Sequence, residues 1–114
     1  MIIIVWCTLA LVTVKITTLG STIAGENYTL DCSVNGKSAT IQWFEESGTP
    51  VTNRGTRTIT TSSSRSQLLF TPLYQSHGGT YTCNATIGGV MESQSVVLFV
   101  NGKTVQYQIQ MIFT

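Results

Sequence analysis

Short runs of alternating apolar and polar residues fill most of the chain, separated by Gly, Asn and Ser. In the run 28–34, Tyr28, Leu30, Cys32 and Val34 alternate with polar residues, which is typical of a strand with one buried face. No stretch stands out with the 3.6-residue period of an amphipathic helix. Such short strands favour an all-β sandwich or barrel. The pattern predicts strands over 12–18, 28–34, 39–44, 57–61, 67–71, 80–87 and 93–100.

Turn residues lie between the predicted strands, among them the strong turn dipeptide Asn35-Gly36 and the pair Gly88-Gly89. Two glycines between extended runs predict a tight hairpin that leads into the strand 93–100, with Val90 and Met91 in the turn. Within each strand, period-two alternation sends alternate side chains to opposite faces. The residues predicted to point inward are Leu30, Cys32, Ile41, Trp43, Leu68, Phe70, Tyr81, Cys83 and Ala85.

The length of 114 residues predicts one domain, which we place at 11–102. The tail 103–114 departs from the preceding rhythm, because apolar residues from Val105 to Phe113 alternate with glutamines. It is either one more strand or the start of a following segment. Residues 1–10 are apolar and short, which suggests a signal peptide cleaved after Ala10, although no Lys or Arg precedes the apolar run. The alternative is an arbitrary start upstream of the domain, in which case Cys7 is a spare thiol.

Charge excludes several classes of protein. The net charge is +1 and no cluster of Lys and Arg occurs, which argues against nucleic-acid binding. No apolar run reaches the roughly 20 residues that a membrane-spanning helix needs. The chain has one histidine, His77, and one aspartate, Asp31, predicted to lie apart, so neither a catalytic triad nor a cofactor site is expected. Metal ligands at close spacing are also missing, and Glu45-Glu46 is interpreted as a solvated patch.

Three residue spacings identify a family resemblance. Cys32 and Cys83 lie 51 positions apart, Trp43 follows the first cysteine by 11 positions, and Tyr81 precedes the second by two. This constellation resembles the immunoglobulin superfamily. The resemblance implies a Greek-key β-sandwich of two antiparallel sheets, with a disulfide between Cys32 and Cys83. It also implies that Trp43 packs against that bridge and that Tyr81 forms a tyrosine corner.

The segment before the second cysteine adds to the resemblance. The family pattern of Leu, Ile, Leu, Asp, Gly, Tyr and Cys is met here, at the same spacing, by Leu68, Phe70, Leu73, His77, Gly79, Tyr81 and Cys83. His77 stands where the family usually has an Asp that pairs with an Arg, for which Arg57 is the candidate. Because histidine cannot supply the carboxylate, the resemblance does not imply an ion pair between His77 and Arg57. The cysteine spacing looks more like the intermediate or constant-2 sets than the longer variable set.

Two acceptor sequences for N-glycosylation occur, at Asn27-Tyr28-Thr29 and Asn84-Ala85-Thr86. Since Tyr28 and Cys83 are predicted to point inward, Asn27 and Asn84 should point outward. The same parity turns Phe44, Val97 and Phe99 outward, with Asn84 between Phe44 and Phe99. We interpret Phe44, Val97 and Phe99 as a candidate partner face, because exposed apolar patches mark interaction surfaces. Cover by the tail or by a neighbouring domain is the alternative.

The resemblance, together with a disulfide that persists only in oxidising compartments, implies a secreted or extracellular recognition module. The expected partner is a protein or cell-surface ligand, and homophilic contact is one form of it. The alternative is a structural spacer, or a fragment of a larger surface protein with many such domains and no ligand for this one. An enzyme is not expected.

Overall fold

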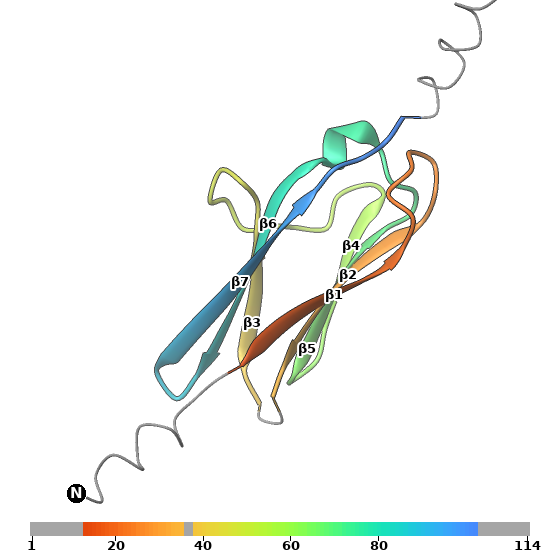
Figure 1. The fold of residues 1–114 in the computed structure, drawn as a ribbon. Coiled ribbons are helices and arrows are strands. Elements are labelled where there is room, and N and C mark those ends of the chain that lie inside the picture. The colour runs from red at the N-terminus through yellow and green to blue at the C-terminus, as the bar shows by residue number, and fades with distance from the viewer. Residues whose placement is uncertain (1–12, 36–37, 103–114) are drawn as a thin grey trace, which may run out of the picture.

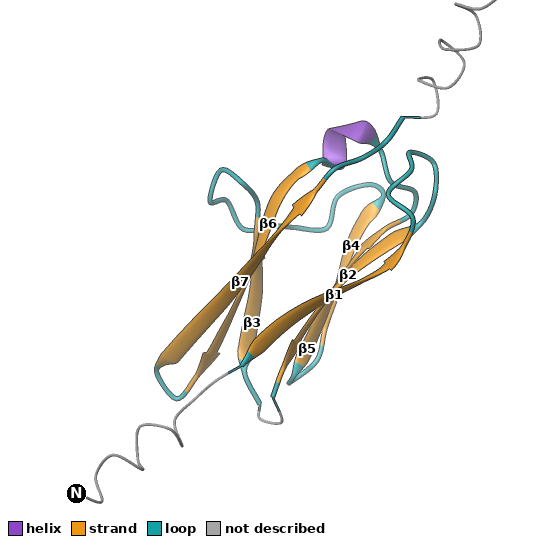
Figure 2. Ribbon diagram, in the orientation of Figure 1, coloured by secondary structure: helices purple, strands orange, loops and turns teal. Residues whose placement is uncertain are grey.

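The computed structural model describes residues 13–35 and 38–102 and shows a sandwich of two antiparallel β-sheets (Figures 1 and 2). One sheet has four strands in the order β1-β2-β5-β4, and the other has three in the order β3-β6-β7. A short 3-10 helix, η1 (Gln75–His77), precedes β6. The strands of the first sheet are β1 (Val14–Gly20), β2 (Tyr28–Val34), β4 (Arg57–Thr61) and β5 (Arg65–Phe70). Those of the second are β3 (Thr40–Phe44), β6 (Gly79–Ile87) and β7 (Val90–Leu98).

The sequence predicts all the strands, and the differences lie at their ends. The strands 28–34 and 57–61 are confirmed without change, while β1 and β5 are shifted by about two residues from the predicted bounds. The largest difference is β7, which begins at Val90 rather than Ser93. Gly88 (φ +52°) and Gly89 (φ +84°) form the whole hairpin turn by themselves, because both adopt the left-handed backbone that a two-residue turn requires. Val90 and Met91 are therefore strand residues.

The core lies between the two sheets and is built from alternate residues of their strands. Every residue that the alternation sends inward is buried, and Leu30, Leu68 and Phe70 are fully so. Cys32 of β2 and Cys83 of β6 form a disulfide that links the two sheets, which confirms the pairing implied by the resemblance. Trp43, which is paired in register with Cys83, is buried beside the bridged strands. The sandwich thus has one continuous apolar core.

The described chain runs through the sandwich from end to end. It enters beside the start of β1 and, after β7, leaves at the opposite end (Figure 1). No helix in the described part is long and apolar enough to cross a membrane. The predicted signal peptide 1–10, Cys7 and the alternating tail 105–113 lie outside the described residues.

Candidate binding face

The outer face of the sheet β3-β6-β7 is free of charge over its described strand positions. Its residues alternate with the buried Trp43, Cys83 and Leu98 and with other inward residues of the same strands. Hydroxyl and amide groups fill its centre, where Thr82 and Ser95 share a hydrogen bond of 2.7 Å between their side-chain oxygens. We call this surface the neutral face. It comprises Thr40, Gln42, Phe44, Thr80, Thr82, Asn84, Thr86, Met91, Ser93, Ser95 and Val97.

The outer face of the four-stranded sheet differs in its charge. Asp31 accepts hydrogen bonds from Arg65 Nε at 3.1 Å and from Gln67 Nε2 at 3.0 Å, and Lys15 lies on the neighbouring strand β1. Charged residues are depleted at the centres of protein interfaces, because their desolvation is costly. The neutral face is therefore the better candidate for contact with another protein.

The residues predicted for a partner face lie on or next to the neutral face. Val97 is 53% exposed and Phe99, one residue beyond the end of β7, is 76% exposed, whereas Phe44 is partly buried. The prediction that Asn84 lies between Phe44 and Phe99 is wrong. Asn84 lies opposite Gln42 and Ser93. The reason is register, since Phe44 pairs with Thr82 and β7 ends before Phe99.

Met91 is an exposed apolar residue of the neutral face that sequence reasoning missed. It pairs with Thr86 and is 62% exposed. The signal that could have found it was the Gly88-Gly89 dipeptide, which closes a two-residue turn without further residues. The apolar residues of this surface thus lie toward its margins, at Phe44, Met91 and Val97, with polar residues between them.

The two predicted glycosylation sites occupy different parts of the fold. Asn27 is exposed and directly precedes β2. Asn84 is partly buried and lies on β6, the central strand of its sheet, where it belongs to the neutral face. Glycosylation at either residue stays a prediction.

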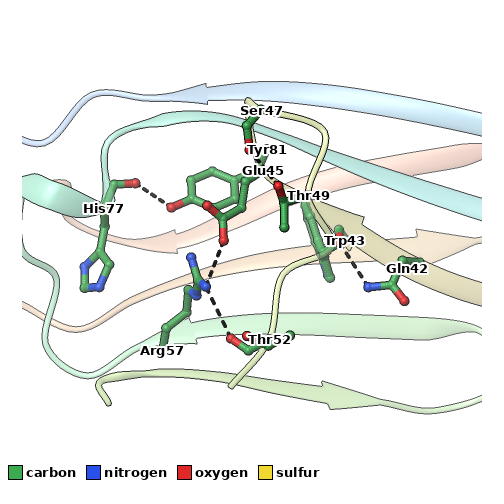
Figure 3. A network of polar contacts seen from close by, with 9 residues as sticks. All are labelled: Gln42, Trp43, Glu45, Ser47, Thr49, Thr52, Arg57, His77 and Tyr81. Carbon is green, nitrogen blue, oxygen red and sulfur yellow. Dashed lines mark hydrogen bonds and ion pairs between the residues drawn. The ribbon is translucent and has the colours of Figure 1, made fainter. Parts of the chain in front are cut away.

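A polar network at one end of the sandwich is centred on Arg57 (Figure 3). The Arg57 side chain is 8% exposed, and its Nη2 donates to Glu45 Oε2 at 3.0 Å and to the Thr52 carbonyl at 3.3 Å. Glu45 therefore provides the carboxylate that His77 cannot. Glu46 is exposed, as the interpretation of Glu45-Glu46 as a solvated patch expects, but its Oε1 also accepts a hydrogen bond from the backbone N–H of Thr80 at 3.0 Å. The interpretation missed these structural contacts of both carboxylates.

His77 and Tyr81 form the other half of this network. The Tyr81 hydroxyl donates to the carbonyl of His77, as a tyrosine corner requires. Nδ1 of His77 accepts a hydrogen bond of 2.8 Å from the backbone N–H of Tyr74, and its ring centre lies 4.8 Å from that of Phe70. Partial burial lowers the pKa of His77, and the nearby Arg57 guanidinium lowers it further. Burial raises the pKa of Tyr81, while Arg57 opposes that shift.

Because the pKa of folded His77 lies below that of the free side chain, we expect acid to weaken the fold through this residue. Between the folded pKa and the unfolded value of about 6.5, the unfolded chain binds more protons, so stability falls as the pH drops through that window. Urea unfolding at about pH 7.5 and about pH 5.5 measures the free energy of unfolding on either side of the unfolded pKa of about 6.5. His77→Asn should show a smaller loss of stability between the two values than the unchanged chain. An equal loss in both chains would contradict this assignment, since the sequence has no other histidine.

A polar cavity of about 240 Å³ opens beside the network. Its polar groups are largely committed within the fold, because Glu45 binds Arg57 and Glu46 binds the backbone of Thr80. Within residues 13–35 and 38–102, no group of three His, Cys, Asp or Glu could hold a metal ion. The arrangement braces the end of the sandwich. The cavity is lined by Glu45, Glu46, Ser47, Arg57, Ser76, Gly78, Gly79, Thr80 and Tyr81.

Gly79, the glycine of the family pattern before the second cysteine, has a conformation that this network requires. It begins β6 with φ +141°, and a Cβ at this position would lie 3.1 Å from Glu46 Oε1. A side chain here would crowd the carboxylate that binds Thr80. The other signature residue of this turn region, Leu73, is fully buried.

Comparison with known proteins agrees with this geometry. The family model of the immunoglobulin domain matches residues 18–100. No curated protein matches the chain. Among solved structures, the Ig7 domain of Dscam1, isoform 5, is 27% identical, with a TM-score of 0.65. That match covers 79% of this chain and 98% of the Dscam1 domain.

Titin domains are similar in fold as well. The I-band fragment I67–I69 of titin is 22% identical with a TM-score of 0.66, over 80% of this chain and 32% of the fragment. The titin M4 domain is 20% identical with a TM-score of 0.61, over 77% of this chain and 95% of that domain. At these identities the likeness shows the fold alone.

Proposed function

The chain belongs to the immunoglobulin domain family, and we propose that it is an extracellular module. In this proposal the module recognises another protein through its neutral face. The observation that carries the proposal is the absence of charge over the described strand positions of that face, combined with the exposed Val97, Met91 and Phe99. Apolar side chains within an uncharged, hydroxyl-rich surface suit a protein partner, since the groups that are costly to desolvate are missing. Adhesion and receptor recognition are the roles that we favour.

An extracellular setting is supported by the disulfide. A bridge between Cys32 and Cys83 persists in oxidising compartments and is rare in the cytosol. The acceptor sequence at Asn27 fits such a setting, as does the predicted signal peptide 1–10. Asn84 lies on the central strand of the neutral face, so the proposed contact requires that this second acceptor sequence carries no glycan. Dscam1 and titin domains share the fold, so the fold by itself does not choose the compartment.

The first step of the test is expression of the full chain in a eukaryotic cell line. We expect the protein in the medium, with a mass that falls on removal of N-linked glycans and rises by two hydrogens on reduction. The partner is then sought by presenting the multimerised domain to a panel of cell-surface ectodomains that includes the domain itself. Binding to one ectodomain supports the proposal. Retention of an unbridged chain in the cell, or binding to none of the panel, contradicts it.

The second step locates the contact with paired variants. Phe44→Ser combined with Phe99→Ser should weaken the binding at least tenfold, which corresponds to about 1.4 kcal/mol. Thr60→Ser on β4 is the matched control, because its side chain lies on the other sheet. Equal binding by both variants would remove the neutral face from the proposal.

A spacer in a chain of several such domains is the second candidate function. The path of the described chain favours it, because the chain enters and leaves the sandwich at opposite ends, so that domains could follow one another in line (Figure 1). Tandem titin domains appear among the structures of similar fold. A spacer needs no ligand, so failure of every ectodomain to bind would favour this role over recognition.

A further inference from the structure

β7 forms an open edge of the three-stranded sheet. In the described chain its only strand partner is β6, and every residue from Val90 to Ser95 is exposed. Edge strands of stable monomers usually carry Lys, Pro or a bulge, which prevent another strand from adding to the edge. β7 has neither Lys nor Pro, and Glu92 is its one charged residue.

The hairpin determines which backbone groups face the open edge. In a two-residue hairpin the closing pair, here Ile87 and Val90, is hydrogen-bonded. Antiparallel pairing then alternates, so Val90, Glu92, Gln94, Val96 and Leu98 bond to β6. The backbone groups of the intervening residues point to the open edge; these residues are Met91, Ser93, Ser95, Val97 and, by continuation, Phe99.

The contacts beyond β7 agree with this alternation and limit the open stretch. Asn101, the next residue of the edge-facing series, donates its N–H to the Thr22 carbonyl at 2.7 Å and accepts from the Ala24 N–H at 2.8 Å. The edge is therefore occupied at Asn101 by the segment after β1. β1 packs beside β7 without pairing with it. Within the described residues, no backbone hydrogen bond reaches the edge from Met91 to Phe99, and the midpoint of this stretch is Ser95.

We propose that β7 pairs antiparallel with β7 of a second copy of this chain, about a two-fold axis at Ser95. This register uses the whole free edge and places Met91 opposite Phe99 of the second copy and Ser93 opposite Val97 of the second copy. Both exposed ends of the edge thereby gain an apolar partner, and a thioether against an aromatic ring is a favourable contact. No charged residue lies in this outward row, so the pairing brings no like charges together on the neutral face.

The pairing joins the two three-stranded sheets into one continuous sheet and gives each copy the same contacts, as a closed two-fold dimer requires. A single added strand buries less area than a standard interface of roughly 1,600 Å², so the dimer is weak. This inference deepens the proposed function, because it names a second copy as a partner at the margin of the neutral face. The pairing shares the side chains of Met91, Val97 and Phe99 with the ectodomain contact, and adds to them the backbone groups of the β7 edge.

Sedimentation velocity of the glycosylated chain tests the pairing. All proteins carry Cys7→Ser to exclude a disulfide between copies, and concentrations extend to about 0.3 mM because micromolar to millimolar dissociation constants are expected. Ser93→Pro removes an N–H that faces the open edge and leaves the bonds to β6 intact. Ser95→Lys places two ammonium groups face to face at the axis. Each should weaken dimerisation at least tenfold.

Thr40→Lys is the matched control, since it adds the same charge at the opposite edge of the same sheet. Dimerisation that Ser93→Pro and Ser95→Lys abolish and Thr40→Lys preserves supports the proposal. A monomer at every concentration, or a dimer that survives Ser93→Pro, overturns it. Phe44→Ser without the Phe99 substitution separates the two proposals. Phe44 lies on β3, at the opposite edge of the sheet from β7, so this variant should reduce ectodomain binding and leave the β7 dimer unchanged.

Discussion

Replacement of Cys32 and Cys83 by alanine is expected to lower the free energy of unfolding by about 4 kcal/mol. The bridge closes a loop with a sequence separation of 51 residues, and the loss of that constraint raises the entropy of the unfolded chain. Both sulfurs lie in a fully buried part of the core, so the alanine side chains also leave a small void. The expected change is a large share of the roughly 5–15 kcal/mol that stabilises an ordinary domain.

Urea unfolding, followed by tryptophan fluorescence, measures this change. All proteins carry Cys7→Ser, so that the only difference is the bridge. A reducing agent should shift the unfolding midpoint of the bridged chain toward that of the double alanine variant, and it should not affect the variant itself. An unchanged midpoint after loss of the bridge would show that the sheets are held together without it.

Trp43→Ala is expected to cost about 3–5 kcal/mol, the range for removal of a large aromatic side chain from a core. Trp43 is 1% exposed and lies in register with Cys83, so removal of its ring leaves a cavity inside the core. The neighbouring strands are tied by the disulfide and cannot collapse far onto the cavity.

Trp43→Phe is the companion variant. It keeps much of the ring and removes the indole N–H, which is buried without a hydrogen-bond partner in the described structure. The buried N–H carries a desolvation penalty, so its removal offsets part of the lost packing, and we expect a cost well below that of Trp43→Ala. Urea unfolding of both variants gives the comparison. Equal costs for the two variants would contradict this expectation, because the phenyl ring would then recover none of the stability that Trp43→Ala loses.

The sequence was sufficient for the core because alternation is a local property. Leu30 and Cys32 on β2, like Tyr81 and Cys83 on β6, differ by the two positions that return a strand to the same face, and no knowledge of the other sheet is needed. The disulfide needed more than alternation. Its pairing followed from the resemblance, and the bridge in the structure confirms it.

The polar network and the layout of the neutral face could not be predicted in the same way. Arg57 begins β4 of one sheet and Glu45 directly follows β3 of the other, so their contact depends on how the two sheets pack. His77 occupies the position of the usual carboxylate, so the expected partner was missing and only the fold could bring Glu45 to Arg57. The neighbours of Asn84 were predicted wrongly because they depend on the register between strands. Alternation within one strand shows which face a residue occupies, but it does not show which residue of the next strand lies opposite.

The disulfide also sets how this domain would respond to a pull along its length. The chain enters and leaves at opposite ends of the sandwich, so tension on the backbone acts through β1 on one side and β7 on the other (Figure 1). The 51 residues of separation between Cys32 and Cys83 are more than half of the described span from 13 to 102. That portion of the backbone cannot extend while the bridge is intact. Reduction would therefore more than double the length that stretching can release, so the redox state of the surroundings would set the extensibility of the domain.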